Sequence, residues 1–239
     1  MIIEQSKQII SEINRAFIGK NDIIEKVLMT IYAGGHVLLE DCPGVGKTTL
    51  AVAFSRVLGL STRRIQFTPD TLPSDITGFT MWNRKTGEFE YRDGAANCQL
   101  LLADEINRTS PKTQSALLEV MEEHTITVDG ETHALPAPFI CIATQNPLGS
   151  AGTQALPESQ LDRFMVSLSI GYPSLEDQMK IISAGASGAR LARLGVRQAV
   201  PAVRFRACCR SAARALAAAA QGRRVAPAEP QRAAGRQGG

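Results

Sequence analysis

The sequence has few of the residues from which disulfide frameworks, zinc sites or membrane spans are built. Its five cysteines include no Cys-x-x-Cys pair, and its three histidines lack the spacing of metal ligands. Such residues are typical of buried thiols and of structural or exposed histidines, and they argue against a disulfide framework or a zinc site. No apolar run approaches the roughly 20 residues of a membrane-spanning helix. Residues 1–20 mix charged with apolar side chains, unlike a signal peptide, so we expect a cytoplasmic protein without membrane association.

Acidic residues are nearly absent from the last quarter of the chain. Residues 1–183 hold 15 basic and 22 acidic residues, a net charge of −7, whereas residues 184–239 hold 11 arginines and one acid, a net charge of +10. The charge of +3 for the whole chain of 239 residues therefore averages two unlike parts and does not indicate nucleic-acid binding. We expect a folded core over residues 1–182 and an Ala/Arg-rich, partly disordered segment over 183–239.

Short apolar runs alternate with helical patterns in the core. Strands alternating with helices predict an α/β fold with a parallel sheet flanked by helices. Two hairpins are predicted in addition, at 79–91 and, around the turn Asp129-Gly130, at 125–135. We expect Trp82, in the first hairpin, to pack beneath that hairpin rather than to contact a partner. The predicted helices lie within 2–31, over 48–58 and from Ser110 onward, and the predicted strands at 37–39, 64–67, 100–103, 139–143 and 166–170.

A glycine-rich segment follows the first predicted strand. It matches a P-loop from the second glycine of that motif onward, with Asp41 in place of the first glycine. Glycines at 44 and 46 would let backbone N–H groups surround phosphates, and the helix that follows adds its dipole. Lys47 would neutralise the β- and γ-phosphates and the Thr48 hydroxyl would bind Mg²⁺, whereas a plain strand-to-helix turn is the alternative. The residues assigned to nucleotide binding here are Pro43, Gly44, Val45, Gly46, Lys47, Thr48 and Thr49.

Acids and an amide follow two other predicted strands. A P-loop site needs an acid beside the Mg²⁺ ion and, for hydrolysis, a base for water; Asp104 fits the first role and Glu105 the second. An acid pair after a strand is also a common helix N-cap. Asn146 ends another strand and could hold the attacking water, although asparagine is also a common turn residue. Because ligands bind at the carboxyl ends of parallel strands, these residues and the glycine loop are expected to share one site.

Arg163 lies in the segment Leu161-Asp162-Arg163-Phe164. An arginine here could stabilise transition-state charge across a subunit boundary. A surface salt bridge with Glu158 or Asp162 is equally compatible with the spacing.

Taken together, these motifs resemble the MoxR family of AAA+ ATPases, in the branch that carries a helix-2 insertion. The resemblance covers roughly residues 1–182 and includes Asp41, which is similar to a tolerated family variant. The segments that carry it are 35–48, 64–70, 72–78, 102–108, 111–119, 143–147, 156–158 and 161–164.

The resemblance implies specific roles for these residues. Lys47 and Thr48 would be the Walker A pair, and Asp104 and Glu105 the Walker B pair. Asn146 would be sensor 1, and Arg163 the finger that reaches a neighbour's nucleotide. The roles implied for other segments are adenine contact by Phe17, Ile18 and Gly19, and a position facing the ring pore for hairpins 79–91 and 125–135.

The resemblance further implies ATP and Mg²⁺ as cofactors and a homo-oligomer, expected as a hexameric ring. The work of this family is chaperone-like: ATP hydrolysis drives the remodelling or maturation of partner enzyme complexes, often with a von Willebrand A-domain protein. A chelatase or DNA-motor subunit is an alternative. The acidic residues of both hairpins disfavour the DNA motor and nucleic-acid binding in general, because neither hairpin offers phosphates a basic track.

After Ser183 the sequence departs from this family. Residues 172–180 resemble the start of its helical lid, and 210–216 with 221–229 resemble its last segment, but the intervening text is too short for a lid. An internal deletion and a reading-frame error both explain this truncated lid remnant. Either would impair nucleotide binding and ring assembly, so a nucleotide-binding module without turnover is a further alternative, and no sensor 2 arginine is assigned.

Overall fold

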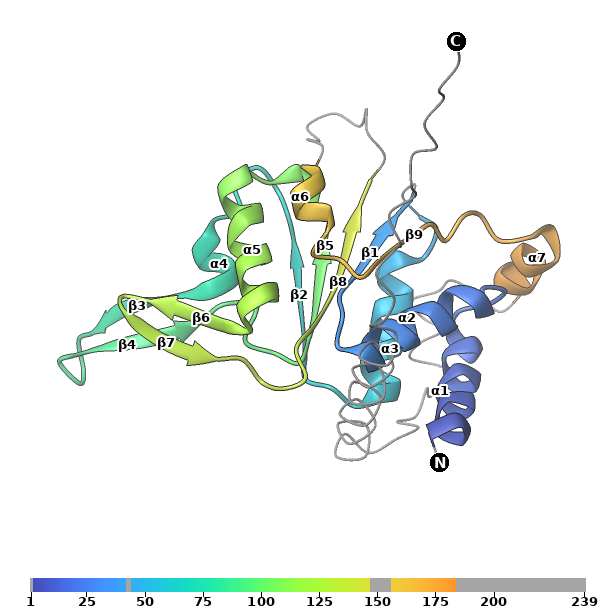
Figure 1. Ribbon diagram of the computed structural model, residues 1–239, viewed down its shortest axis with the longest axis horizontal. Coiled ribbons are helices and arrows are strands. Elements are labelled where there is room, and N and C mark those ends of the chain that lie inside the picture. The colour runs from blue at the N-terminus through green and yellow to red at the C-terminus, as the bar shows by residue number, and fades with distance from the viewer. Residues whose placement is uncertain (1, 42–43, 147–155, 184–239) are drawn as a thin grey trace, which may run out of the picture.

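The computed structural model describes residues 2–41, 44–146 and 156–183. Its centre is a five-stranded parallel sheet with the strand order β2-β5-β8-β1-β9 (Figure 1). The predicted lid remnant at 183–239, from residue 184 onward, and the predicted phosphate-loop residue Pro43 lie outside the described residues. The sheet strands are β1 (Val37–Glu40), β2 (Thr62–Gln66), β5 (Leu100–Asp104), β8 (Ile140–Gln145) and β9 (Val166–Leu168).

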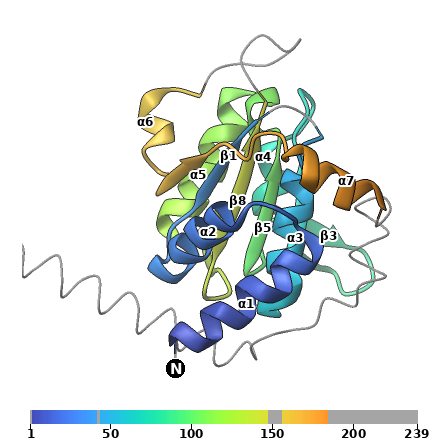
Figure 2. The same cartoon turned by 90° about the vertical axis from the view of Figure 1, so that its right-hand side faces the viewer.

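Helices cover both faces of the sheet, as the pattern predicts. Along β5, Leu100 and Leu102 join one apolar cluster while Leu101 and Ala103 join another, because successive side chains of a strand point to opposite faces. The first cluster packs under α1 (Ile2–Ala16), α2 (Asn21–Ala33) and α3 (Lys47–Leu58). The second packs under α4 (Pro73–Thr77) and α5 (Pro111–Glu123), and Figures 1 and 2 show the two helical layers on either side of the strands. The predicted α/β fold with a parallel sheet is therefore confirmed.

Three short helices complete the framework. A 3₁₀ turn, η1 (Ile106–Arg108), follows β5, and α6 (Glu158–Leu161) precedes β9. Helix α7 (Leu175–Ser183) follows β9 and lies where the lid was expected to begin. Among the described helices, none is long and apolar enough to cross a bilayer.

Both predicted hairpins are present and extend from one end of the molecule (Figure 1). The first pairs β3 (Gly78–Asn83) with β4 (Glu88–Asp93), and the second pairs β6 (Thr125–Val128) with β7 (Glu131–Ala134). The ring of Tyr91 stacks on that of His133, with centroids 4.2 Å apart, and so joins the two hairpins. The expectation for Trp82 is wrong, because it lies 51% exposed, in edge-to-face contact with Phe89 across the hairpin.

His36 is structural, as expected. It lies just before β1 and is buried; the backbone N–H of Cys141 donates to its Nδ1, and its Nε2 lies 3.0 Å from the Met121 carbonyl. Burial lowers its pKa to about 4, so the ring is neutral and bridges the sheet to α5. Cys141 and Cys98 are buried thiols without a disulfide.

Candidate active site

The turn between β1 and α3 forms the floor of the site. Gly44 and Gly46 both have positive φ, 89° and 95°, which glycine adopts without steric cost. A Cβ on Gly46 would lie 3.0 Å from the Phe17 ring, so a side chain there would also be crowded. Gly46 is the N-cap of α3, which begins at Lys47, and the free N–H groups of a helix start attract anions.

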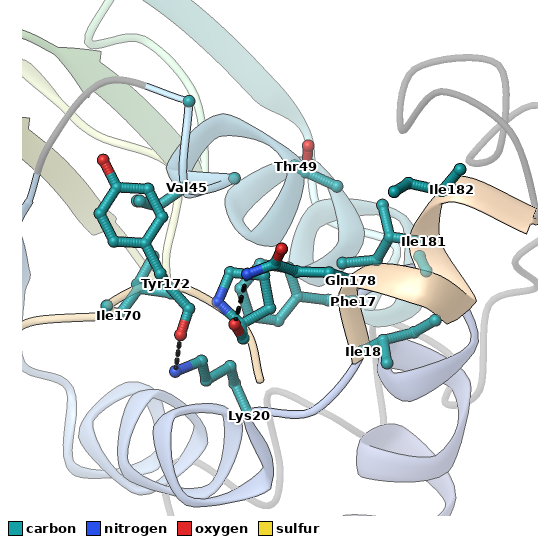
Figure 3. A pocket seen from close by; sticks show the side chains of 15 residues that line it. Phe17, Ile18, Lys20, Val45, Thr49, Ile170, Tyr172, Gln178, Ile181 and Ile182 are labelled. Atoms are coloured by element: carbon teal, nitrogen blue, oxygen red, sulfur yellow. Dashed lines mark hydrogen bonds between the residues drawn. The ribbon is translucent and has the colours of Figure 1, made fainter. Parts of the chain in front are cut away.

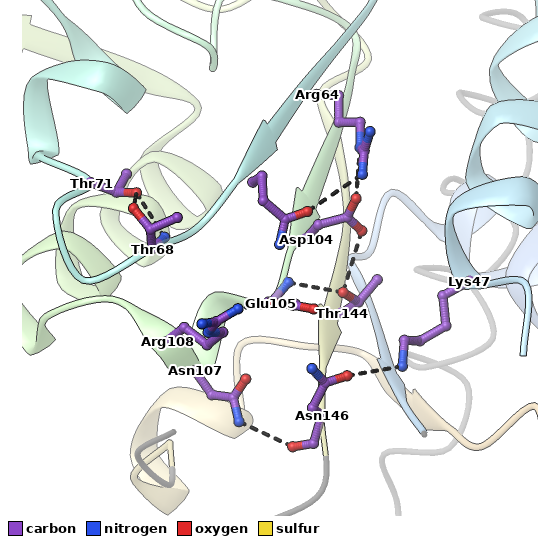
Figure 4. Close-up of polar contacts among 11 residues, drawn as sticks. Lys47, Arg64, Thr68, Thr71, Asp104, Glu105, Asn107, Arg108, Thr144 and Asn146 are labelled. Carbon is purple, nitrogen blue, oxygen red and sulfur yellow. Dashed lines mark hydrogen bonds and ion pairs between the residues drawn. The ribbon is translucent and has the colours of Figure 1, made fainter. Parts of the chain in front are cut away.

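Lys47 is 8% exposed, and its amine lies among oxygen atoms from two strand ends. The amine donates to the main-chain oxygen of Asp41, which follows β1. It also lies 3.4 Å from Oδ1 of Asn146, which follows β8 (Figure 4). A nearly buried ammonium that keeps open space beside it is suited to bind a phosphate oxygen.

Asp104, at the end of β5, is 4% exposed and has a partner on each oxygen. Its Oδ1 accepts a hydrogen bond of 3.3 Å from the Thr144 hydroxyl. Its Oδ2 accepts one of 3.5 Å from the Thr48 hydroxyl. The same oxygen accepts one of 2.7 Å from Nε of Arg64, on β2 (Figure 4). A hydroxyl and a carboxylate oxygen that converge beside a phosphate loop fit Mg²⁺, which prefers oxygen ligands.

Glu105 lies beside Asp104 with φ of 58°, a left-handed conformation that is costly for this residue type. The Thr144 hydroxyl accepts the Glu105 backbone N–H at 2.9 Å, and so helps to hold this conformation. The Glu105 carboxylate pairs with Arg108 at 2.9 Å. That hydrogen bond, together with Asn146 and the charge of Lys47, lowers the pKa of Glu105 against the opposing effect of burial. The carboxylate is therefore ionised at neutral pH, as a general base must be.

These groups line one cavity of about 390 Å³, which we name the polar cavity. The sequence assigned most of its residues to a single site, and the structure brings them together. Sequence reasoning missed Arg64, Gln66 and Thr144, although all three lie within motifs that carry the family resemblance. The lining residues are Gly44, Gly46, Lys47, Thr48, Thr49, Arg64, Gln66, Asp104, Glu105, Thr144 and Asn146.

A second cavity, of about 300 Å³, continues from the same glycine turn (Figure 3). We name it the apolar cavity, because isoleucine, valine and aromatic side chains form most of its wall. Gly19 does not line this cavity; its chain approaches α7 so closely that a Cβ would lie 2.2 Å from an Asp177 oxygen. The lining residues are Ala16, Phe17, Ile18, Lys20, Gly44, Val45, Gly46, Thr49, Ile170, Gly171, Tyr172, Pro173, Gln178, Ile181 and Ile182.

Arg163 lies apart from both cavities. Its Nε pairs with Glu122, on α5, at 2.9 Å, and its Nη1 donates to the Ser159 carbonyl. A surface salt bridge is thus present, but its partner is neither Glu158 nor Asp162. Within one chain, Arg163 therefore does not serve the polar cavity.

Comparisons with known proteins agree with this geometry. A family model described as the ATPase family associated with various cellular activities (AAA) matches residues 36–166. The uncharacterized protein YeaC of Bacillus subtilis is 55% identical over 174 residues, which are 73% of this chain and 54% of YeaC. The chaperone MoxR1 of Mycobacterium tuberculosis is 45% identical over 173 residues, 72% of this chain and 46% of MoxR1. The chain thus spans about half the length of these relatives.

The solved structures give the same result. The crystal structure of an ATPase candidate from Cytophaga hutchinsonii aligns with a TM-score of 0.76 at 34% identity. The alignment covers 87% of this chain and 63% of that chain.

Proposed function

Because this chain belongs to the MoxR family of AAA+ ATPases, we propose that its polar cavity binds the phosphates of ATP with Mg²⁺ and hydrolyses the terminal phosphate. The observation that carries this proposal is the convergence of Lys47, Asp104, Glu105 and Asn146 on one cavity at the glycine turn. Residues 1–182 would form the nucleotide-binding core, and the apolar cavity would hold the base.

Five side chains of the polar cavity have tasks suited to their positions. The Lys47 ammonium and the turn's backbone N–H groups hold the β- and γ-phosphate oxygens. The Thr48 hydroxyl and Asp104 would hold Mg²⁺, which supplies charge neutralisation at the phosphates. Glu105 accepts a proton from the attacking water, and the Asn146 amide orients that water.

The proposal extends to assembly. Arg163 lies on the surface just after α6 and pairs with an exposed Glu122, so its guanidinium can be released to a neighbouring copy. Stabilisation of transition-state charge by an arginine supplied from another subunit would make turnover depend on a ring, which we propose to be a hexamer.

The work done would be the remodelling or maturation of partner enzyme complexes, with a von Willebrand A-domain protein as a companion. Two findings support a chaperone-like role: MoxR1 is named a chaperone, and the paired hairpins expose apolar side chains at Trp82 and Phe89. Exposed apolar surface that is held on a rigid hairpin is suited to contact other proteins.

The proposal is tested by Glu105→Gln, with ATP affinity and phosphate release measured on the same preparation. We expect turnover to fall roughly 10²–10⁴-fold, because the amide cannot accept the proton from water. ATP affinity should be retained, because Glu105 is not placed on the phosphates. The matched control is Glu119→Gln, an exposed carboxylate on α5 that lies outside both cavities.

Two results would contradict the proposal. If Glu105→Gln hydrolysed ATP at the rate of the parental chain, that carboxylate would not be the general base. Tight ATP binding by the parental chain, with neither turnover nor assembly, would instead support a nucleotide-binding module.

A further inference from the structure

Asp41 stands where the P-loop pattern has its first glycine, and its backbone does not require a glycine. Non-glycine residues with positive φ in the described part of the chain are Glu105, His124 and Asp129. Asp41 instead continues the strand pairing, since its N–H donates to the Gln145 carbonyl at 3.3 Å. The presence of a carboxylate here therefore calls for an explanation in terms of its contacts.

The Asp41 carboxylate holds the segment that follows β9. Its Oδ2 accepts a hydrogen bond of 2.5 Å from the backbone N–H of Gly171 and one of 3.0 Å from the Ser169 hydroxyl. Hydrogen bonds to an ionised acceptor are about twice as strong as neutral ones. Meanwhile the main-chain oxygen of Asp41 accepts the Lys47 amine. One residue thus contacts both the phosphate loop's lysine and the chain 130 positions further on.

The segment held by Asp41 forms one wall of the apolar cavity. Ile170, Gly171 and Tyr172 line the cavity on that side, and Gly44 and Gly46 of the phosphate loop line it as well. Gly171 turns the chain with φ of 65°, and the Lys20 amine holds the Tyr172 carbonyl at 3.1 Å (Figure 3). Through these contacts Asp41 links the 169–172 segment to the phosphate loop, and both line the apolar cavity.

We propose that Asp41 is a positioning residue for the base of the nucleotide: its carboxylate holds the 169–172 segment against the phosphate loop. This inference rests on the proposed function, since it assumes a nucleotide that spans both cavities. Asp41→Gly restores the regular P-loop glycine, yet it should weaken nucleotide binding.

The test compares two ligands on the full chain at a fixed Mg²⁺ concentration. ATP can occupy both cavities, whereas inorganic tripolyphosphate can occupy only the polar one. For Asp41→Gly we expect ATP affinity to fall about tenfold, the effect of losing a charged hydrogen bond, and tripolyphosphate affinity to stay unchanged. Asp41→Asn, which keeps an acceptor oxygen, should retain most of the ATP affinity.

Glu40→Ala is the matched control. It removes the preceding acid, whose Oε1 accepts a hydrogen bond of 2.6 Å from the Ser167 hydroxyl, on β9. Neither of these residues lines a cavity of the site. Glu40→Ala should leave both affinities unchanged. Should Asp41→Gly fail to fold, Ser169→Ala removes one of the two contacts without altering the phosphate loop. That variant should lower the affinity for ATP about threefold and leave the affinity for tripolyphosphate unchanged.

Several results would overturn the inference. If Asp41→Gly lowered the affinities for ATP and tripolyphosphate equally, Asp41 would act through the phosphate loop. If Glu40→Ala lowered the ATP affinity as much as Asp41→Gly does, Asp41 would merely stabilise the sheet edge. Unchanged ATP affinity in Asp41→Gly, with the parental chain binding both ligands, would overturn this inference alone. A parental chain that binds neither ligand would overturn the proposed function and this inference with it.

Discussion

The two cavities that meet at the glycine turn are built in different ways. The polar cavity takes its charged side chains from β2, from the end of β5 and from the start of α3, where backbone hydrogen bonding fixes each position. The apolar cavity takes its walls from the end of α1, from the chain after β9 and from α7, which all lie beside the sheet rather than in it. The chemistry of phosphate binding dictates the residue types of the polar cavity, whereas the apolar cavity needs only a suitable shape and an apolar surface.

The charges differ as well. The polar cavity contains a nearly buried ammonium, Lys47, and a nearly buried carboxylate, Asp104, and such groups are rarely buried unless they have partners. The charged residue that lines the apolar cavity is Lys20, and its amine donates a hydrogen bond to the Tyr172 carbonyl. Substitutions in the polar cavity should therefore affect any ligand with phosphates, whereas those in the apolar cavity should affect only ligands with a base.

The largest effect is expected from Lys47→Ala. Removing a nearly buried ammonium from the phosphates should weaken ATP and tripolyphosphate alike, by roughly 100-fold. Isothermal titration calorimetry with both ligands measures this, and Lys112→Ala, at an exposed position on α5, is the control. If Lys47→Ala lowered the affinity for ATP alone, the phosphates would not lie at this lysine, and the distinction between the two cavities would fail.

The polar cavity was largely predictable from the sequence. Phosphates and Mg²⁺ require particular residue types in a fixed order at strand ends, so the glycine loop singled out Lys47 and Thr48, and its presence favoured Asp104. Asn146 was a weak candidate from its place at a strand end and gained its role from the family resemblance. Arg64 was missed for a physical reason. Its contact with Asp104 depends on the register of β2 against β5, which pairs Arg64 with Leu102, and no local pattern reveals register.

The apolar cavity was much less predictable. Ile170, Gln178 and Ile181 are ordinary core or surface residues in a sequence, and only the family resemblance indicated the nearby Ile18. Arg163 shows the same limit, because its partner, Glu122, is 41 positions away while local spacing offered only Glu158 and Asp162. Contacts between distant elements follow from the packing of the whole fold, which residue types alone do not fix.

A smaller and more selective effect is expected from Tyr172→Ala. The ring lines the apolar cavity (Figure 3), and the residue is 70% exposed, so its removal should cost the fold little. Because the variant loses an aromatic face beside the base, its affinity for ATP should fall about tenfold, while its affinity for tripolyphosphate should stay unchanged. Tyr172→Phe keeps the ring and should retain parental affinity. An equal loss for both ligands in Tyr172→Ala would mean that the cavities are not separable.

The smallest effect, opposite in direction, is expected from Arg64→Gln in the polar cavity. The oxygen of Asp104 that accepts Nε of Arg64 at 2.7 Å is also the one nearest the Thr48 hydroxyl, so the guanidinium and Mg²⁺ compete for it. The Arg64 side chain is 55% exposed, and solvent screening makes this competition modest. Arg64→Gln should therefore lower the Mg²⁺ concentration for half-maximal ATP binding by about threefold.

The measurement is a titration of ATP binding with Mg²⁺, starting from EDTA. Arg63→Gln is the control, since that arginine lies on the same strand but contacts Gly94 and Asp93 instead. A higher Mg²⁺ requirement in Arg64→Gln would reverse the interpretation: Arg64 would then orient Asp104 for the ion. In that case the polar cavity would depend on its edge strand as strongly as the apolar cavity depends on Asp41.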